Sequence, residues 1–411
     1  MRKIFTVCIA LLVASCLSED GASPGKGTTF IRYYNGGNND QASALEMTPE
    51  GGFVILATTR VQKTEADIAH FKIKIIKTDA EGNPLITAFF PDIASTTADY
   101  TGSSIQTLPG GGYVVTGEDI QPDGTRKVLI MTVDDNLTKK TLTSMYANGT
   151  PSVIPASGKA VTVNTNGNVL VLSSNSPDKM YLAEIDKADY KTVKWVINYS
   201  AGATDLANKL FVDENGKILW SGLATKNGLT GIRMIKTPPN SINSEFDLLI
   251  SIPGFTEVGT DFCRFGYGYA ITGSTNQKAG STTPAADTDI LFKRLAPDGT
   301  VLSTSSFPLG DKDSQNDVGN AISSTQDGGL ILLSSVNSIA IDGEGDTDYY
   351  LIKINAFGDK EWVSDFGSRY KDEGVAIRQV SGGSYVLLGT TTQGALKILT
   401  LIKTDKNGKI E

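Results

Sequence analysis

Histidine and cysteine are almost absent from this sequence. Its 411 residues include one histidine, His70, and three cysteines, Cys8, Cys16 and Cys263. A metal site built from several histidines is therefore impossible, and a catalytic triad with a histidine base would have to use His70. Because His70 lies beside no nucleophile motif, we predict no catalytic role for it. We expect no catalytic residue, metal or cofactor, and paired carboxylates among the 45 acidic residues are the enzymatic alternative.

A surplus of basic residues is also missing. The chain has 37 Lys and Arg against 45 Asp and Glu, which gives a net charge of −8. Removal of residues 1–15 would take two positive charges and no negative ones, so that the net charge falls to −10. Such a chain lacks the basic footprint that nucleic acid or an anionic lipid surface attracts, and we expect no nucleic-acid partner.

Long apolar runs are limited to the N-terminus. Residues 4–13 are apolar and follow Arg2 and Lys3, and the run is too short to cross a bilayer, so it predicts a signal peptide. The run ends in VASC at 13–16, which resembles a bacterial lipobox. That resemblance implies cleavage after residue 15 and acylation of Cys16, with palmitate as an expected modification. An ordinary signal peptide with a chance cysteine is the alternative.

The residues after the predicted lipidation site suggest a location. Residues 16–27 are rich in Gly and Ser and predict a flexible tether. Leu17 stands where an aspartate is the usual inner-membrane retention signal, which favours the outer membrane. The SED at 18–20 resembles the acidic export tag of surface lipoproteins in Bacteroidetes-like bacteria, and both periplasmic and surface orientations stay open. Only Cys263 then remains in the folded part, so we expect no disulfide.

A glycine turn followed by an apolar strand recurs seven times. The apolar runs begin at Phe53, Tyr113, Val169, Ile218, Tyr269, Leu330 and Tyr385, about 55 residues apart. A second apolar strand that ends in a polar turn with glycine follows each copy, most clearly FKIKIIKTDAEG at 71–82. With a strand before each glycine turn, such as 321–325, and one after the polar turn, every unit holds four strands.

Four-stranded units of this length, repeated seven times, predict a β-propeller, because each sheet buries its faces only against its neighbours. We therefore predict an all-β fold with one seven-bladed propeller over 28–411. Residues 28–34 are predicted to form an outer strand that precedes the first complete unit. The last unit has no outer strand of its own, because the chain ends where that strand would begin. Pairing of these N- and C-terminal strands would close the ring and remove an exposed edge.

The repeats resemble the DGGY…IKTDxxGN propeller repeats of bacterial and archaeal secreted proteins and lipoproteins. The resemblance is best at QDGG, 326–329, and IKTDKNG, 402–408, and it covers nearly all of the chain after the leader. Blades three to five depart from the pattern, for example with TPP at 237–239. The resemblance implies a fold and an envelope location but no shared reaction.

An aspartate recurs before the first strand of five units, as Asp40, Asp99, Asp205, Asp317 and Asp372. One interpretation is an acidic ring at the mouth of the central channel that binds a cation or a basic ligand. The other is that each carboxylate accepts backbone N–H bonds and stabilises its turn. Recurrence in every well-formed repeat favours the structural interpretation.

Two long polar loops, 274–289 and 335–348, are adjacent in blade order and are expected on the channel-mouth face. Long loops on a rigid scaffold commonly carry binding sites, and tolerated insertions are the alternative. The second loop has carboxylates at alternate positions from Asp342 to Asp348, a spacing that suits either Ca²⁺ or a solvated acidic loop. We expect Cys263 to be a small buried thiol, and Trp195 and Trp362 to occupy equivalent outer-strand positions.

Taken together, these features predict an outer-membrane-anchored, non-catalytic propeller that binds a protein or glycan partner through its channel-mouth loops. A polysaccharide-acting enzyme with carboxylates at the channel mouth is one alternative, and a structural subunit of an envelope complex is another. Because propellers carry many unrelated functions, the choice depends on the site rather than on the fold.

Overall fold

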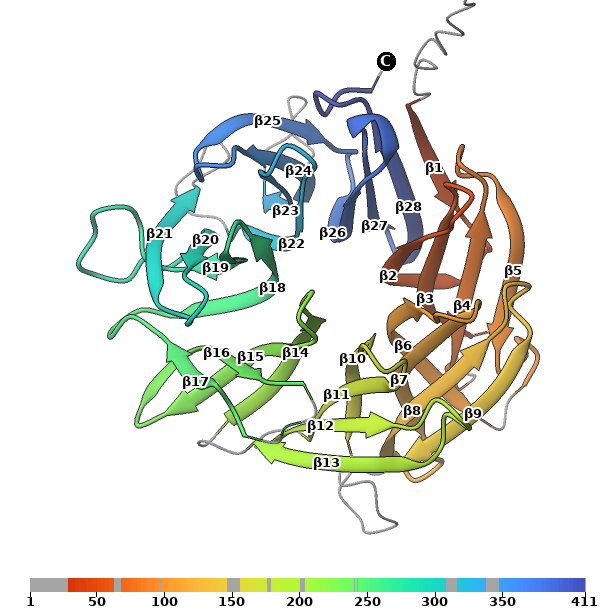
Figure 1. Ribbon diagram of the computed structural model, residues 1–411. Helices are drawn as coiled ribbons and strands as arrows, with labels where there is room; N and C mark the ends of the chain where they lie inside the picture. Colours follow the sequence, from red (N-terminus) through yellow and green to blue (C-terminus); the bar gives the residue numbers. More distant parts are fainter. Residues whose placement is uncertain are drawn as a thin grey trace, which may run out of the picture.

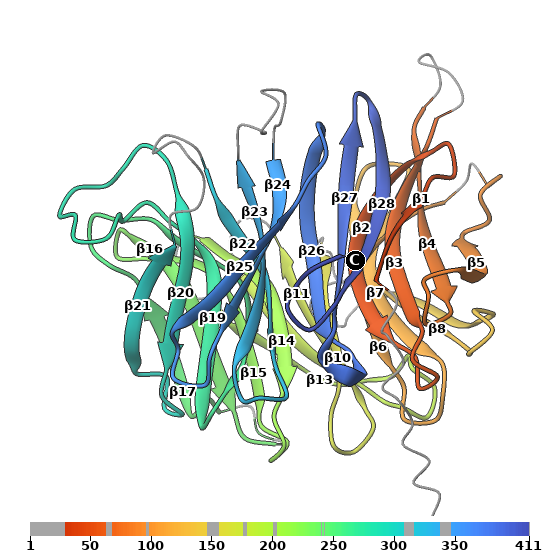
Figure 2. The same ribbon diagram turned by 90° about the horizontal axis from the view of Figure 1, so that it is seen from above.

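The computed structural model describes residues 29–62, 68–95, 98–145, 156–175, 179–199, 204–239, 241, 243–307, 316–337 and 347–410. These residues form seven four-stranded antiparallel sheets arranged in a ring (Figure 1). Figure 2 shows the ring from the side, with the strands running between the two faces of a disc. The prediction of an all-β, seven-bladed β-propeller is confirmed.

The strands of the blades occupy four equivalent positions. The innermost strands are β2 (Asn39–Met47), β6 (Asp99–Thr107), β10 (Ser157–Val163), β14 (Thr204–Val212), β18 (Glu257–Phe265), β22 (Val318–Ser324) and β26 (Lys371–Gln379). The second strands are β3 (Phe53–Val61), β7 (Tyr113–Ile120), β11 (Val169–Asn175), β15 (Ile218–Lys226), β19 (Gly268–Thr275), β23 (Leu330–Asn337) and β27 (Tyr385–Gln393). The third strands are β4 (His70–Thr78), β8 (Arg126–Val133), β12 (Lys179–Ile185), β16 (Leu229–Thr237), β20 (Asp289–Leu295), β24 (Thr347–Ile354) and β28 (Leu396–Thr404). The outermost strands are β5 (Pro84–Phe90), β9 (Lys139–Met145), β13 (Val193–Tyr199), β17 (Phe246–Ile250), β21 (Val301–Phe307), β25 (Lys360–Phe366) and β1 (Phe30–Tyr34).

The last blade joins the two ends of the chain. Its order is β26-β27-β28-β1, and β1 pairs antiparallel with β28 from Phe30 opposite Lys403 to Tyr34 opposite Leu399 (Figure 1). Tyr34 also donates its hydroxyl to the Gly82 carbonyl of the first blade at 2.7 Å. The predicted closure of the ring by the terminal strands is therefore confirmed.

The hydrophobic core lies between neighbouring blades. One cluster joins Val54 and Ile73 of the first blade to Ile105 and Tyr113 of the second, and the other clusters follow the same plan. Second and third strands are covered on both faces by these contacts, so consecutive residues are buried, and the third strand β4 buries Lys72 and Lys74 beside its apolar residues. Outermost strands such as β9 are only partly covered and carry polar residues.

A β-bulge interrupts every innermost strand at the same place. The register with the second strand shifts between Ala42/Ala44, Gly102/Ser104, Gly158/Ala160, Ala207/Lys209, Gly259/Asp261, Gly319/Ala321 and Gly374/Ala376. The residue before each bulge is Gly or Ala because the preceding blade packs against it. A Cβ on Gly374, for example, would lie 2.7 Å from the Leu333 side chain.

Several predictions fall on residues outside the described part of the chain. These are the signal peptide 1–15, the lipidated Cys16, the tether 16–27 and the carboxylates at 342–346. Within the described ranges, no helix is long and apolar enough to span a membrane.

Candidate functional site

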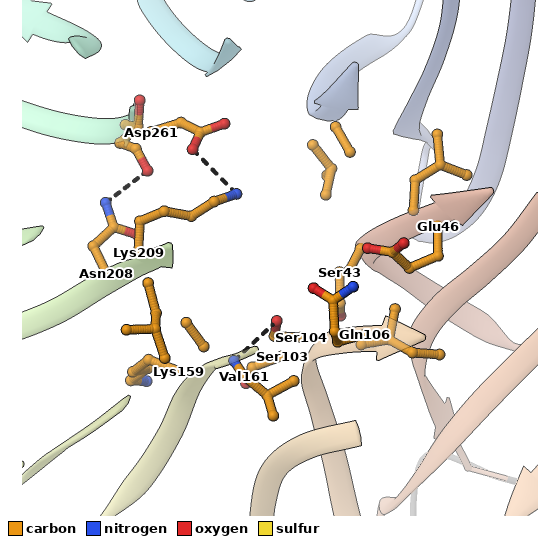
Figure 3. A pocket seen from close by; sticks show the side chains of 18 of the residues that line it. Ser43, Glu46, Ser103, Ser104, Gln106, Lys159, Val161, Asn208, Lys209 and Asp261 are labelled. Atoms are coloured by element: carbon orange, nitrogen blue, oxygen red, sulfur yellow. Dashed lines mark hydrogen bonds and ion pairs between the residues drawn. The ribbon is translucent and has the colours of Figure 1, made fainter. Parts of the chain in front are cut away.

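The innermost strands of all seven blades line a central cavity of about 400 Å³ (Figure 3). Its lining begins at the bulges and includes the residue that each bulge inserts. These bulge residues are Ser43, Ser103, Lys159, Asn208, Thr260, Asn320 and Val375. A bulge turns a side chain away from the regular alternation of the strand. The seven bulges therefore supply a ring of side chains to one cavity.

Hydrogen bonds between blades hold several of these side chains in place. The Asn208 amide donates to the carbonyls of Gly259 at 2.7 Å and Thr260 at 2.8 Å. The Thr260 hydroxyl donates in turn to the Gly319 carbonyl of the next blade. Asn320 differs from them, because its Oδ1 is buried and accepts no hydrogen bond within the described residues.

Asp261 is the fixed anion of the cavity. Its side chain is 5% exposed and lies 3.1 Å from Lys209 Nζ (Figure 3). It also accepts the backbone N–H of Phe262 at 2.8 Å and of Ile322 at 3.1 Å. With a cation and two N–H donors, the carboxylate of Asp261 is satisfied by the protein, and it neutralises Lys209.

Glu46 lies across the cavity from Asp261 and has a different environment (Figure 3). Burial raises the pKa of the Glu46 carboxyl above its usual value, although the charges of Arg378 and Lys209 partly oppose that rise. Among the residues that the structure describes, none bonds to this carboxylate. The two carboxyl groups of the cavity are therefore chemically unlike each other.

Two further cations line the cavity with spare hydrogen-bonding capacity. Arg378 donates from Nη1 to the Ile377 carbonyl at 2.9 Å, and within the described chain it forms no ion pair. Lys159 Nζ lies 3.9 Å from Glu118 Oε1, while Arg126 binds the same carboxylate at 2.9 Å. Both cations can accept an anion from outside the protein.

The predicted aspartates do not line this cavity. Asp40, Asp205, Asp317 and Asp372 are buried, and each is bonded inside or next to its own blade. Asp205 pairs with Arg233 at 3.0 Å on the third strand of its blade, and Asp372 accepts the Ser368 N–H at 2.9 Å. These contacts support the structural interpretation, with third-strand cations as partners that the sequence did not indicate. Glu257, which pairs with Lys293 at 2.8 Å, has the same role and was missed.

His70 and Cys263 both lie outside the cavity lining. His70 Nδ1 is 3.1 Å from Asp99 Oδ1, at the junction of the first two blades. Burial raises the pKa of the Cys263 thiol to about 12, which suppresses the reactive thiolate. Cys263 lies on the innermost strand of blade five, as predicted, but its side chain is partly rather than fully buried. Trp195 and Trp362 do occupy equivalent outer-strand positions, each just before a register shift.

The long loop of blade five lies away from the cavity lining. The loop follows Thr275 of β19, which pairs with Glu257 at the first residue of the innermost strand β18. The residues of β18 that line the cavity come later in that strand, at the bulge. Lys278 fastens this loop by contacts with Asp287 and Asp289. Of the residues that the structure describes, none from this loop lines the cavity. Residues 277–280 of this loop instead line a separate pocket of about 480 Å³ with Thr304, Ser305 and Ser306 of β21, so the prediction of a binding site in the loop stays a prediction.

Comparison with known proteins supports the fold and gives no information about the chemistry of the cavity. No protein-family model and no curated protein matches this chain. Among solved structures, YCF48 bound to a D1 peptide has a TM-score of 0.51 at 10% identity, covering 92% of this chain and 96% of that one. Sqt1 from Chaetomium thermophilum has a TM-score of 0.50 at 11% identity, covering 92% and 85%. The likeness is one of fold.

Proposed function

We propose that this protein is an outer-membrane-anchored propeller that binds a polar group of a glycan or protein partner inside its central cavity. The proposal keeps the envelope location that the lipobox-like VASC at 13–16 predicts. It transfers the binding site from the long loops to the ring of bulge residues. Anchoring would present this cavity to partners in the envelope.

The observation that carries the proposal is a contrast between two neighbouring positions of the repeat. The position before each bulge is Gly or Ala in all seven blades, as expected of a residue that blade packing requires. The bulge position itself is polar in six blades and takes five different residue types. A packing requirement would make these residues alike, whereas recognition of one asymmetric ligand requires them to differ.

The binding site can be tested by filling the cavity. Ser103→Trp places a large side chain at a bulge, where the cavity rather than the core receives it. Asn198→Trp on the exposed outer strand β13 is the matched control. We expect a mild-detergent pull-down from the native envelope to lose its partner with Ser103→Trp and to keep it with Asn198→Trp. Equal capture by both folded variants would refute a site in the cavity.

The anchor needs its own test. Cys16→Ser removes the only sulfur that the predicted lipidation can use. We expect this variant to lose metabolic labelling with palmitate and to leave the membrane fraction. Continued acylation or membrane attachment would contradict the lipoprotein part of the proposal.

A second candidate function is hydrolysis of a polysaccharide. It is favoured by the unlike surroundings of the two carboxyl groups, since a raised pKa suits Glu46 as a general acid, whereas Asp261 is paired with Lys209. Glu46→Gln separates the two candidates. Turnover of envelope polysaccharides that disappears in this variant supports the enzyme, whereas unchanged partner capture without any turnover supports the binding module.

A further inference from the structure

We propose that the group bound in the cavity is the carboxylate of an acidic sugar, a uronic acid residue of a glycan, and that Arg378 binds it. This inference rests on the proposed function and specifies the chemistry of its partner. It follows from the charges of the cavity, their existing partners and the neutral side chains around them.

The charges of the cavity differ in sign from those of the whole chain. The protein has a net charge of −8, yet the cavity contains Lys159, Lys209 and Arg378 against Glu46 and Asp261. The three cationic side chains therefore outnumber the two carboxyl groups of the cavity. In an acidic protein, a cationic cavity attracts an anion to that place and not to the rest of the surface.

The existing ion pairs show which cation is available. Asp261 neutralises Lys209 at 3.1 Å and is already bonded to two backbone N–H groups. Arg378 uses one guanidinium nitrogen on the Ile377 carbonyl and, within the described residues, pairs with no carboxylate. A guanidinium group matches a carboxylate with two parallel N–H···O bonds, so Arg378 is the natural first contact for such a ligand.

The neutral side chains suit the hydroxyl groups of a sugar. Ser43 and Ser103 can each donate or accept a hydrogen bond. No aromatic side chain occurs among the described residues that line the cavity, so binding depends on hydrogen bonds rather than on stacking. A volume of about 400 Å³ lies within the range of about 300–1,000 Å³ typical of small-molecule sites.

The test compares ligands that differ only in charge. Detergent-solubilised full-length protein is titrated calorimetrically with digalacturonate, with its neutral methyl ester and with a sulfated galactose disaccharide. We expect the ester to bind at least about tenfold more weakly than the acid, because a charged hydrogen-bonded pair is lost. Equal affinity for acid and ester, or a preference for the sulfated disaccharide, would overturn the inference.

A pair of variants assigns the contact to Arg378. Arg378→Gln should weaken digalacturonate binding about tenfold and leave binding of the ester unchanged. Arg369→Gln, an identical change at an exposed arginine in the connection between β25 and β26, should have no effect. Equal affinity of the two variants for digalacturonate would refute the role of Arg378.

The outcomes also separate this inference from the proposed function. If Ser103→Trp abolishes capture of the envelope partner but digalacturonate neither binds nor competes, the cavity is the site and the uronate inference is wrong. If Ser103→Trp leaves capture unchanged, the proposed function itself fails.

Discussion

Replacing Phe30 by alanine tests how strongly the N-terminal strand holds the ring closed. Phe30 is 6% exposed and meets the Phe53 ring of the first blade edge-on, with 6.5 Å between the centroids. It also covers Gly82, where a Cβ would lie 2.8 Å from the ring. Truncation of a buried phenylalanine to alanine costs about 3–5 kcal/mol. Because β1 is an outermost strand, we expect the lower end, about 3 kcal/mol.

The expected change is measurable by denaturation. With about 2.1 cal/mol/K of unfolding entropy per residue, a loss of about 3 kcal/mol lowers the melting temperature of this domain by about 4 °C. Guanidinium titration followed by tryptophan fluorescence provides an independent reading, since Trp220 is fully buried. Ile31→Ala on the same strand is the control, because Ile31 is 40% exposed and its loss should cost less than about 1 kcal/mol.

A shift for Phe30→Ala no larger than that for Ile31→Ala would refute the reasoning that terminal pairing stabilises the ring. Tyr34→Phe refines the result, because it removes only the hydroxyl that donates to Gly82 at 2.7 Å. That single hydrogen bond is worth about 1 kcal/mol. If Phe30→Ala costs about 3 kcal/mol and Tyr34→Phe about 1 kcal/mol, packing contributes more than hydrogen bonding to the stability of the closed ring.

Three further predictions follow from the buried charges and the Cys263 thiol. Arg233→Met leaves Asp205 buried without its cation and should cost about 3–5 kcal/mol in a denaturant titration; an unchanged midpoint would contradict the pairing. The raised pKa of Glu46 means that the folded state holds this proton more tightly than the unfolded state, so this group makes stability fall as pH rises above the usual carboxyl range. Glu46→Gln should therefore flatten the pH dependence of the melting temperature above about pH 4.5, and identical profiles would count against the burial argument. Cys263, with a pKa of about 12, should react with a thiol reagent at pH 8 only as fast as the protein unfolds, and rapid labelling of the native state would disprove its inertness.

The seven blades can be compared with one another position by position. Seven copies of one structural unit within a single chain show which positions the fold requires, because those positions keep the same kind of residue. Gly or Ala before the bulge belongs to that class, and so do the acidic residues at the start of the innermost strands. The bulge residues vary from blade to blade, which is the contrast on which the proposed binding site rests.

The sequence by itself determined the seven-bladed architecture and the closure of the ring. Glycine turns and apolar runs recur with a spacing that only a ring of four-stranded sheets satisfies, and residues 28–34 could pair only with the last blade. Local chemistry also determined the roles of isolated residues, so the structural role of Asp205 and the place of Cys263 on an innermost strand could be predicted.

The tertiary structure alone decided where the cavity lies and which charges face it. A bulge depends on the register between two strands, and that register is set by packing against the preceding blade, which no local pattern records. Glu46 and Asp261 are more than 200 residues apart in the chain, and only closure of the ring brings them to the same cavity. In the sequence, the long loops stand out as insertions between the repeated strands. The residues that line the cavity belong to the repeated strands themselves, so nothing in the sequence distinguishes them.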